Sequence, residues 1–358
     1  VRRQRMVLAG REGSVTLPGA RWYFPNGGAA GFYRCALDDR SVTLLAGELQ
    51  RLRPEERLVL LDDQWALARA RRAPLARFVE LVAGLRGERD RAVLQLLSGL
   101  LGWLSEHVVT DEGRTAFDRF VDRIYRPELE ALGWDPRPDD SSDEREKRAI
   151  CISALGTKAR AEDVRREARR RIEAHLGSGP RIAPDLAGVL AAVGAIDGDS
   201  ALYERYVARM KESAKADAQE ESRFRSGLID FADDVLVRRT AEGIFTDLIR
   251  EQDRPLMLIR MLGLRRAREQ AWRVVREKWD ERVATMDPGG KQSVVTGIGQ
   301  LTPRKLAPDA IAFLRDRQTP DIKETATQAI ERLRLDSATA ERMAAELPEA
   351  LERVAERV

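Results

Sequence analysis

From residue 41 onward, apolar residues recur every three or four positions, as they do along one face of an α-helix. The stretch 117–132 shows this pattern over six apolar residues, at i, i+3, i+4, i+7, i+12 and i+15: Phe117, Phe120, Val121, Ile124, Leu129 and Leu132. Pro54 and Pro74 stand where helices would start, since proline at the first helical position loses no hydrogen bond. The pattern predicts about eighteen to twenty amphipathic helices of about 10–20 residues each.

The first forty residues show a different pattern. Short apolar and aromatic runs at 5–9, 14–17, 21–24 and 31–37 are separated by glycine and proline, which is typical of β-strands joined by turns. Four strands without a second layer cannot enclose a core. We therefore expect residues 1–40 to be the terminal strands of a truncated β-sandwich domain. The alternative is a complete small sheet packed on the helices that follow.

Short connections separate the predicted helices, and such connections imply antiparallel neighbours. The chain has 358 residues, whereas one compact core usually stops growing at roughly 250–300 residues. No strict repeat is present, but helix pairs about every 35–45 residues suit a degenerate superhelix. We predict a mostly α fold, a HEAT- or armadillo-like α-solenoid over residues 41–358, in preference to a globular bundle.

The charges favour a soluble protein with solvated helix faces. The chain has 62 Lys and Arg against 59 Asp and Glu, a net charge of +3, and the two signs are interleaved along the sequence. Interleaving of this kind argues against a nucleic-acid partner. The longest nearly apolar run, residues 186–196, is shorter than the ~20 residues of a membrane helix, so we expect no membrane association. We predict a cytoplasmic protein.

Histidine and cysteine usage excludes several kinds of catalytic site. His107 and His175 are too far apart in sequence for a His-Glu-x-x-His zinc motif. Cys35 and Cys151 form no Cys-x-x-Cys pair and indicate reduced cysteines. His107 follows an apolar run and is predicted to be a core or cap residue. We therefore predict no catalytic, cofactor-binding or metal-binding residue in this chain, and we leave the substrate-facing residues unassigned.

Other motifs have simple structural explanations. The segment 287–293 lacks the first glycine and the hydroxyl residue of a phosphate loop, so a helix-joining turn is expected. Gly297 and Gly299 are better explained by close helix packing than by dinucleotide binding. The neighbouring acidic pairs at 38–39, 62–63, 139–140 and 233–234 are expected to be caps and turns. The arginine cluster at 165–171 is interspersed with acids, which favours an ion-paired helix face.

Four stretches taken together resemble the C-terminal region of the zinc aminopeptidases related to aminopeptidase N, puromycin-sensitive aminopeptidase and the endoplasmic reticulum aminopeptidases. Residues 26–34 (NGGAAGFYR) are similar to the strand that closes the family's β-sandwich domain. Residues 54–70 (PEERLVLLDDQWALARA) resemble the first long helix of its helical domain and are the most specific of the four. Residues 132–134 and 271–280 match later patterns in the expected order.

The resemblance implies a non-catalytic C-terminal domain that encloses the active-site cavity and controls the access of peptides. The family's zinc motif and its Gly-x-Met-Glu-Asn motif are absent from this sequence. Zinc and catalysis are therefore expected in an upstream peptidase domain, which would be the partner of this chain together with peptides in the cavity. The alternatives are a stand-alone α-solenoid that binds a protein or peptide, and, less favoured, a helical-repeat nucleic-acid binder.

Overall fold

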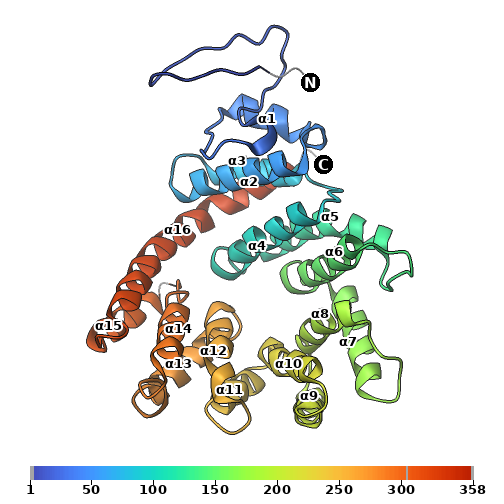
Figure 1. Ribbon diagram of the computed structural model, residues 1–358, viewed down its shortest axis with the longest axis vertical. Coiled ribbons are helices and arrows are strands. Elements are labelled where there is room, and N and C mark those ends of the chain that lie inside the picture. The colour runs from blue at the N-terminus through green and yellow to red at the C-terminus, as the bar shows by residue number, and fades with distance from the viewer. Residues whose placement is uncertain (1–3, 304, 356–358) are drawn as a thin grey trace.

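The computed structural model of the chain describes residues 4–303 and 305–355. Over these ranges, sixteen α-helices follow one another around a curved stack (Figure 1). They are α1 (Asp39–Ala46), α2 (Pro54–Arg69), α3 (Leu75–Ala83), α4 (Arg91–His107), α5 (Arg114–Leu132), α6 (Ser142–Ser153), α7 (Glu162–Leu176), α8 (Pro184–Ala195), α9 (Ser200–Ser213), α10 (Ala218–Gly227), α11 (Asp234–Gly243), α12 (Arg254–Gly263), α13 (Arg268–Lys278), α14 (Pro288–Ile298), α15 (Ala307–Asp316) and α16 (Lys323–Ala355).

Six shorter helical segments lie between them: η1 (Gly27–Ala29), η2 (Leu49–Arg51), η3 (Ala154–Lys158), η4 (Leu228–Asp230), η5 (Glu251–Asp253) and η6 (Trp279–Val283), of which η3 and η6 are π-helical. The described ranges thus contain fewer α-helices than the sequence pattern predicts. Part of the difference is α16, which runs for 33 residues and exceeds the expected helix length. Other segments, such as η5, make only a single 3₁₀ turn.

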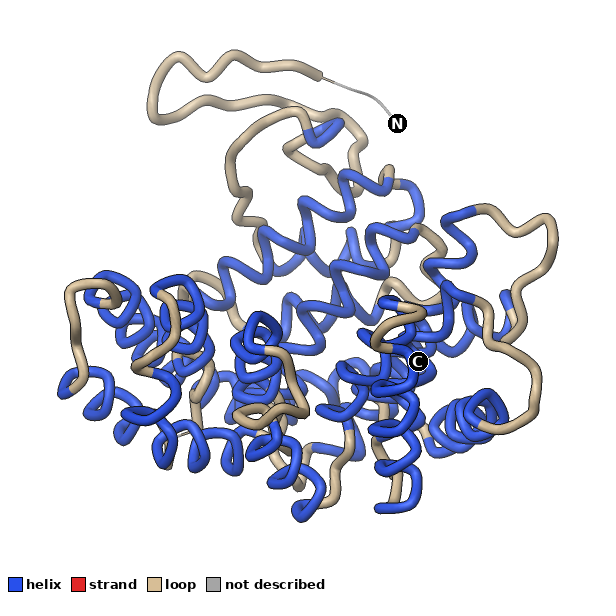
Figure 2. Tube along the Cα trace, turned by 60° about the horizontal axis from the view of Figure 1, so that its bottom comes forward, coloured by secondary structure: helices blue, strands red, loops and turns tan. Residues whose placement is uncertain are grey.

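The predicted strands are wrong for the part of the chain that the structure describes, because no strand is present there. Residues 4–24 form an extended two-limbed arm that reaches away from the helices (Figure 2). Within the arm, one backbone hydrogen bond joins the Ala20 N–H to the Leu17 carbonyl oxygen (3.2 Å). A strand requires a ladder of hydrogen bonds to a neighbour, and this arm has no neighbouring strand to provide one.

The fourth predicted strand, residues 31–37, lies along α2 instead of beside another strand. The Cys35 N–H donates to Asp63 Oδ2 (2.9 Å), and Gln64 Nε2 donates to the Cys35 carbonyl oxygen (3.2 Å). Side chains of a helix therefore satisfy backbone groups that a sheet would otherwise pair. The domain boundary near residue 40 stays a prediction; α1 begins at Asp39, where Asp38 caps it by accepting from the Ser41 N–H (2.9 Å).

The helices pack in two rows. The even-numbered helices contact one another in succession from α2 to α10 and again from α12 to α16, and η4 connects the two runs. The odd-numbered helices pack beside this row, as α5 does on α6, α7 on α8 and α9 on α10. At the far end, α16 returns to contact α3 and α5, so the curved stack closes on itself (Figure 1).

The buried apolar residues form two clusters. The first, here called core 1, extends from Leu37 to Val193 and includes the second half of α16, from Ala340 to Val354. The second, core 2, extends from Ile172 to Leu333 and includes the first half of α16. Two places therefore connect the cores: the α7–α8 pair, which contributes residues to both, and α16.

Candidate functional site

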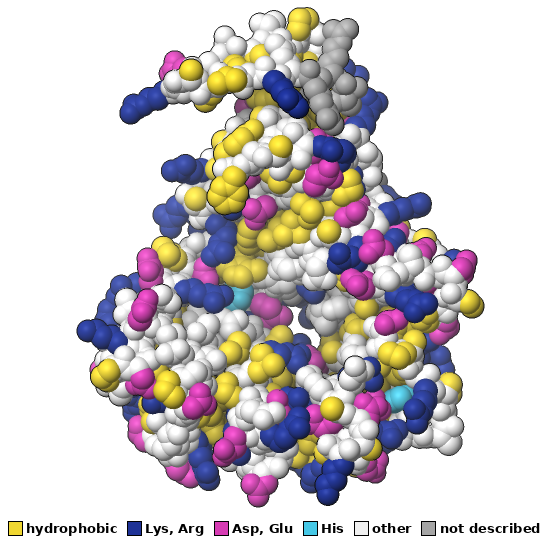
Figure 3. Space-filling model, viewed as in Figure 1, with side chains coloured by type: hydrophobic (Ala, Val, Ile, Leu, Met, Phe, Trp, Pro, Cys, Tyr) yellow, Lys and Arg dark blue, Asp and Glu magenta, His cyan; other side chains and the backbone are white. Residues whose placement is uncertain are grey.

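A partly exposed stripe on α4 forms the candidate functional site. Leu96, Leu100 and Trp103 are half-buried and pack on core 1 from one side, and Gly99 is exposed between them. Their spacing of three and four residues places them on one face of the helix. Figure 3 shows hydrophobic side chains gathered over α4, where they border a hollow in the middle of the molecule. A partly apolar concave surface of this kind can hold an extended peptide.

Aromatic and basic side chains hold Trp103 in place. Its ring meets Trp65 of α2 edge-on at a centroid distance of 5.5 Å, and the Arg69 guanidinium lies 5.2 Å from its centroid. The His107 ring lies 5.3 Å away, one helical turn further along α4. Edge-to-face aromatic pairs and cation–π contacts each add stabilisation beyond the burial of area. The stripe therefore ends in a rigid, partly basic corner.

Lys158, the last residue of η3, lies against the same helix. Its Cε atom is 3.2 Å from the position a Cβ atom would take at Gly102, so the absence of a side chain at 102 makes room for the lysine. Burial lowers the pKa of Lys158 to about 8, and nearby Glu106 opposes this effect. No sequence pattern pointed to Lys158, because its proximity to Gly102 depends on how η3 packs on α4.

His107 is the last residue of α4 and is half-buried, next to the C-cap residue Val108. Its Nδ1 atom forms a hydrogen bond with Thr302 Oγ1 at 2.8 Å. Burial lowers the pKa of His107 to about 3, and the positive charges of Arg268, Arg332 and Arg69 lower it further. The imidazole is therefore neutral at physiological pH.

His175 lies near the end of α7 and uses both ring nitrogens. Nε2 is 2.7 Å from Glu220 Oε1, and Nδ1 accepts from the Ile182 N–H (3.3 Å). In the part of the chain that the structure describes, the two histidines do not form a zinc site, because His175 uses both ring nitrogens and His107 Nδ1 is bonded to Thr302. Within the described ranges, no group of three or more His, Cys, Asp and Glu side chains is placed to hold a metal ion.

The arginine cluster on α7 forms the expected ion-paired face. Arg165 reaches Asp197 (3.1 Å), Arg169 reaches Asp199 (2.9 Å), and Arg170 pairs with Glu167 on its own helix (2.7 Å). These carboxylates occupy the guanidinium groups that a phosphate backbone would otherwise contact.

The acidic pairs also have structural roles. Asp38 and Asp233 are helix caps, and Asp233 Oδ1 accepts from the Val235 and Leu236 N–H groups. Asp62 and Asp63 both face Arg34, at 2.8 and 3.5 Å. Asp38 and Asp233 are thus caps as expected, whereas the expectation of caps and turns is wrong for Asp62 and Asp63, which lie inside α2 and pair with Arg34.

The two glycine motifs have different outcomes. The segment 287–293 is not the expected helix-joining turn, because Asp287 caps α14 by accepting from the Gly290 N–H (3.0 Å) and the helix begins at Pro288. A Cβ atom at Gly297 would lie 3.1 Å from Ile259 Cα, and one at Gly299 would lie 3.3 Å from Ala329 Cα. Close helix packing therefore explains these two glycines.

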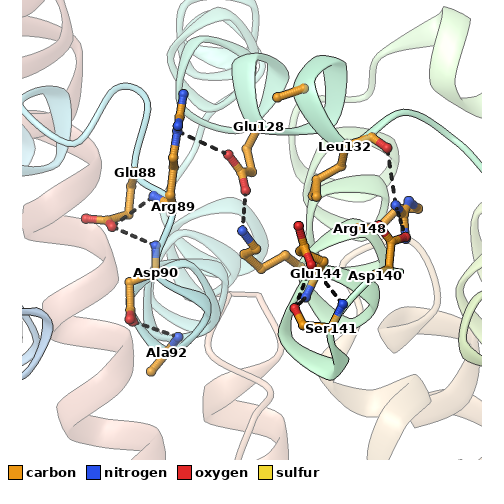
Figure 4. A network of polar contacts seen from close by, with 12 residues as sticks. Glu88, Arg89, Asp90, Ala92, Glu128, Leu132, Asp140, Ser141, Glu144 and Arg148 are labelled. Carbon is orange, nitrogen blue, oxygen red and sulfur yellow. Dashed lines mark hydrogen bonds and ion pairs between the residues drawn. The ribbon is translucent and has the colours of Figure 1, made fainter. Parts of the chain in front are cut away.

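A buried polar network, which sequence reasoning missed, fixes the loops on the side of core 1 (Figure 4). Glu88 is fully buried, accepts from the Arg89 and Asp90 N–H groups, and pairs with Arg57 (2.8 Å). Arg148 is fully buried and donates to Asp140 (2.6 Å) and to the Leu132 and Gly133 carbonyl oxygens. Because these partners come from loops, only the folded chain reveals the network.

The fold and this site define an α-helical domain with a concave, partly apolar face. The profile of the family described as "ERAP1-like C-terminal domain" matches residues 22–335. The chain belongs to this family.

Curated relatives are aminopeptidases. Aminopeptidase M1 of Arabidopsis thaliana is 27% identical over 343 residues, covering 91% of this chain and 38% of the relative. Aminopeptidase M1-A of Oryza sativa subsp. japonica is 25% identical, covering 96% of this chain and 41% of the relative. Aminopeptidase 2, mitochondrial, of Saccharomyces cerevisiae is 24% identical, with 91% and 35% covered. The chain thus spans about two fifths of these relatives, and it matches their C-terminal part.

Within residues 4–303 and 305–355, none of the helices combines the length and the apolar character needed to cross a bilayer.

Proposed function

We propose that this chain is the non-catalytic C-terminal domain of a zinc-dependent aminopeptidase, and that its HEAT-like helical stack encloses the cavity in which peptides are held. The observation that carries the proposal is the family match over residues 22–335, together with relatives that are aminopeptidases and extend well beyond this chain. Zinc and the reacting groups would belong to an upstream peptidase domain, since no donor set among residues 4–303 and 305–355 fits zinc.

The exposed hydrophobic residues near the N-terminal end support a partner domain that is joined to this chain at that end. Of eleven exposed large hydrophobic residues in the described ranges, eight lie between residues 6 and 33: Met6, Val7, Leu8, Val15, Leu17, Tyr23, Phe32 and Tyr33. Apolar side chains gathered in this way indicate a surface that another part of a protein covers. We assign that cover to the upstream peptidase domain.

The α4 stripe supports contact with the peptide. Gly99 is exposed, and a Cβ atom placed there would meet nothing within 4 Å. A side chain at position 99 would therefore occupy the concave face without disturbing the core. This makes position 99 suitable for testing the role of the stripe.

The experiment compares Gly99→Lys with Val235→Lys in the protein made from the complete reading frame. Val235 is 73% exposed on α11 and serves as a matched surface control. We expect Gly99→Lys to lower kcat/KM at least fivefold for peptides of about ten residues and to leave kcat/KM for an aminoacyl amide unchanged. We expect Val235→Lys to change neither value. Equal effects of the two variants, or no effect on long peptides, would contradict the proposed peptide contact.

A further inference from the structure

A polar contact site lies where the curved stack closes, between segments 154 to 195 positions apart. On the side of core 1, it consists of the end of α4 and the loop after it, with Glu106, His107 and Asp111. On the side of core 2, it consists of Arg265 in the loop before α13, Arg268 at the start of α13 and Thr302 after α14. Stacked helical repeats contact their immediate neighbours, so a direct contact at this separation is a feature of closure.

The contacts across the site are hydrogen bonds and ion pairs. Arg268 Nη2 donates to the Glu106 carbonyl oxygen (2.6 Å), and the Arg265 N–H donates to Glu106 Oε2. Arg265 Nη2 donates to Asp111 Oδ1 (2.7 Å), and Arg265 also donates to the Val109 carbonyl oxygen. Thr302 Oγ1 is bonded to His107 Nδ1 (2.8 Å), so six residues take part through their side chains and Val109 through its backbone alone. We call this set of six residues the polar lock.

The burial of Arg268 destabilises the closed polar lock. Its side chain is 2% exposed, yet Nε and Nη1 have no hydrogen-bond partner among the described residues. A buried donor without a partner costs free energy that water would restore. Separation of the lock would hydrate the unpaired donors of Arg268, which lowers the free energy that holds the lock closed.

We propose that the chain consists of two rigid halves, core 1 and core 2, which rock against each other when the polar lock opens, with the α7–α8 pair and α16 as the two hinges. Both hinges lie where the cores share helices, so they stay intact during the motion. The middle of α16 is suited to bending, because it carries buried Asp336 paired with Arg69 of α2 and Arg332, between the apolar segments of the two cores. This inference does not depend on the proposed function.

The first test measures the distance between the two halves by electron–electron double resonance spectroscopy on the full chain. Spin labels are placed at Thr115→Cys on α5 and Val235→Cys on α11, both exposed, with Cys35→Ser to remove the other accessible thiol. We expect Glu106→Ala with Asp111→Ala to broaden the distribution or add a second distance. The matched control, Asp143→Ala with Glu146→Ala, removes two carboxylates of α6 that pair with Arg91 of α4, away from both hinges, and leaves the distribution unchanged.

The second test uses the unaltered chain and so does not depend on a variant that folds. Hydrogen exchange at the Arg265 amide reports the lock directly, since that N–H donates to Glu106. We expect it to exchange at least tenfold faster than core amides such as those of Leu97 or Val275, as a local opening does. Exchange of Arg265 at the rate of global unfolding, or an unchanged distance distribution in the lock variant, would overturn the proposal.

Discussion

Single residues on this chain owe their properties to partners that are remote in sequence. The apolar run before His107 indicated a core or cap position, whereas the structure places it half-buried in the last turn of α4, next to the C-cap residue Val108. The histidine's partner Thr302, 195 positions away, and the arginines that lower its pKa could not be read from spacing, because they meet only when the stack closes. The contact between Lys158 and Gly102 likewise could not be read from spacing, because it depends on how η3 packs on α4.

The pKa of His107 makes stability depend on pH. It is about 3 in the folded chain against 6.5 for an unperturbed imidazole, so between these values the unfolded chain binds one more proton. The contribution is fully present above pH 6.5 and is lost as the pH falls, by about 1.4 kcal/mol per pH unit. The charged groups around the ring are Arg69 from α2, Glu106 from α4, Arg268 from α13 and Arg332 from α16.

The measurement is urea unfolding at pH 7 and pH 5 for the natural chain and for His107→Gln, which keeps a hydrogen-bonding side chain but cannot titrate. The variant should lose less stability than the natural chain over this interval, because other titrating groups contribute equally to both. Equal losses would contradict a depressed pKa at His107.

Alanine substitutions at two glycines are expected to change stability in opposite directions. A Cβ atom at Gly84, just after α3, would lie 2.2 Å from the backbone oxygen of Ala46, which cannot move aside cheaply. Gly84→Ala should therefore destabilise the chain by about 2 kcal/mol or more, as overpacking does. Gly188, inside α8, has nothing within 4 Å of a Cβ atom, and Gly188→Ala should stabilise by about 1 kcal/mol through helix propensity. Thermal unfolding of both variants would detect a reversed order.

At the scale of elements, local signals predicted helices well and strands poorly. Pro54 opens α2 as predicted, while Pro74 is the cap before α3, one residue from the predicted start. The first forty residues do contain the short apolar runs that are typical of strands, but the described residues provide no neighbouring strand with which these runs could pair. A helix needs only its own hydrogen bonds, whereas a strand depends on a partner, which explains the difference.

The second half of α16 should contribute strongly to stability. Met343 is fully buried in core 1, whereas Leu335 on the same helix is 61% exposed. We expect Met343→Ala to destabilise the chain by about 2–5 kcal/mol, the usual cost of a cavity in a core. Leu335→Ala should change stability by less than about 0.5 kcal/mol. Denaturant titration of the pair tests the expectation, and similar losses would show that α16 is not packed as described.

At the scale of the whole molecule, the helical class followed from periodicity, but the closure of the stack did not. Nothing in the spacing indicates that α16 returns to α3, or that it joins two cores. The candidate site was equally hidden, because the stripe on α4 is an ordinary apolar pattern whose exposure depends on closure. The resemblance to aminopeptidases, by contrast, was available from four sequence stretches, and the family match confirms it.

We propose that this chain is a peptide-enclosing domain without a catalytic centre of its own. The most direct test is metal analysis with an aminopeptidase assay on the 358-residue chain and on the protein from its complete reading frame. We expect only the longer protein to bind zinc in stoichiometric amount and to cleave an aminoacyl amide. Turnover by the purified 358-residue chain, or a longer protein without zinc and activity, would contradict the claim.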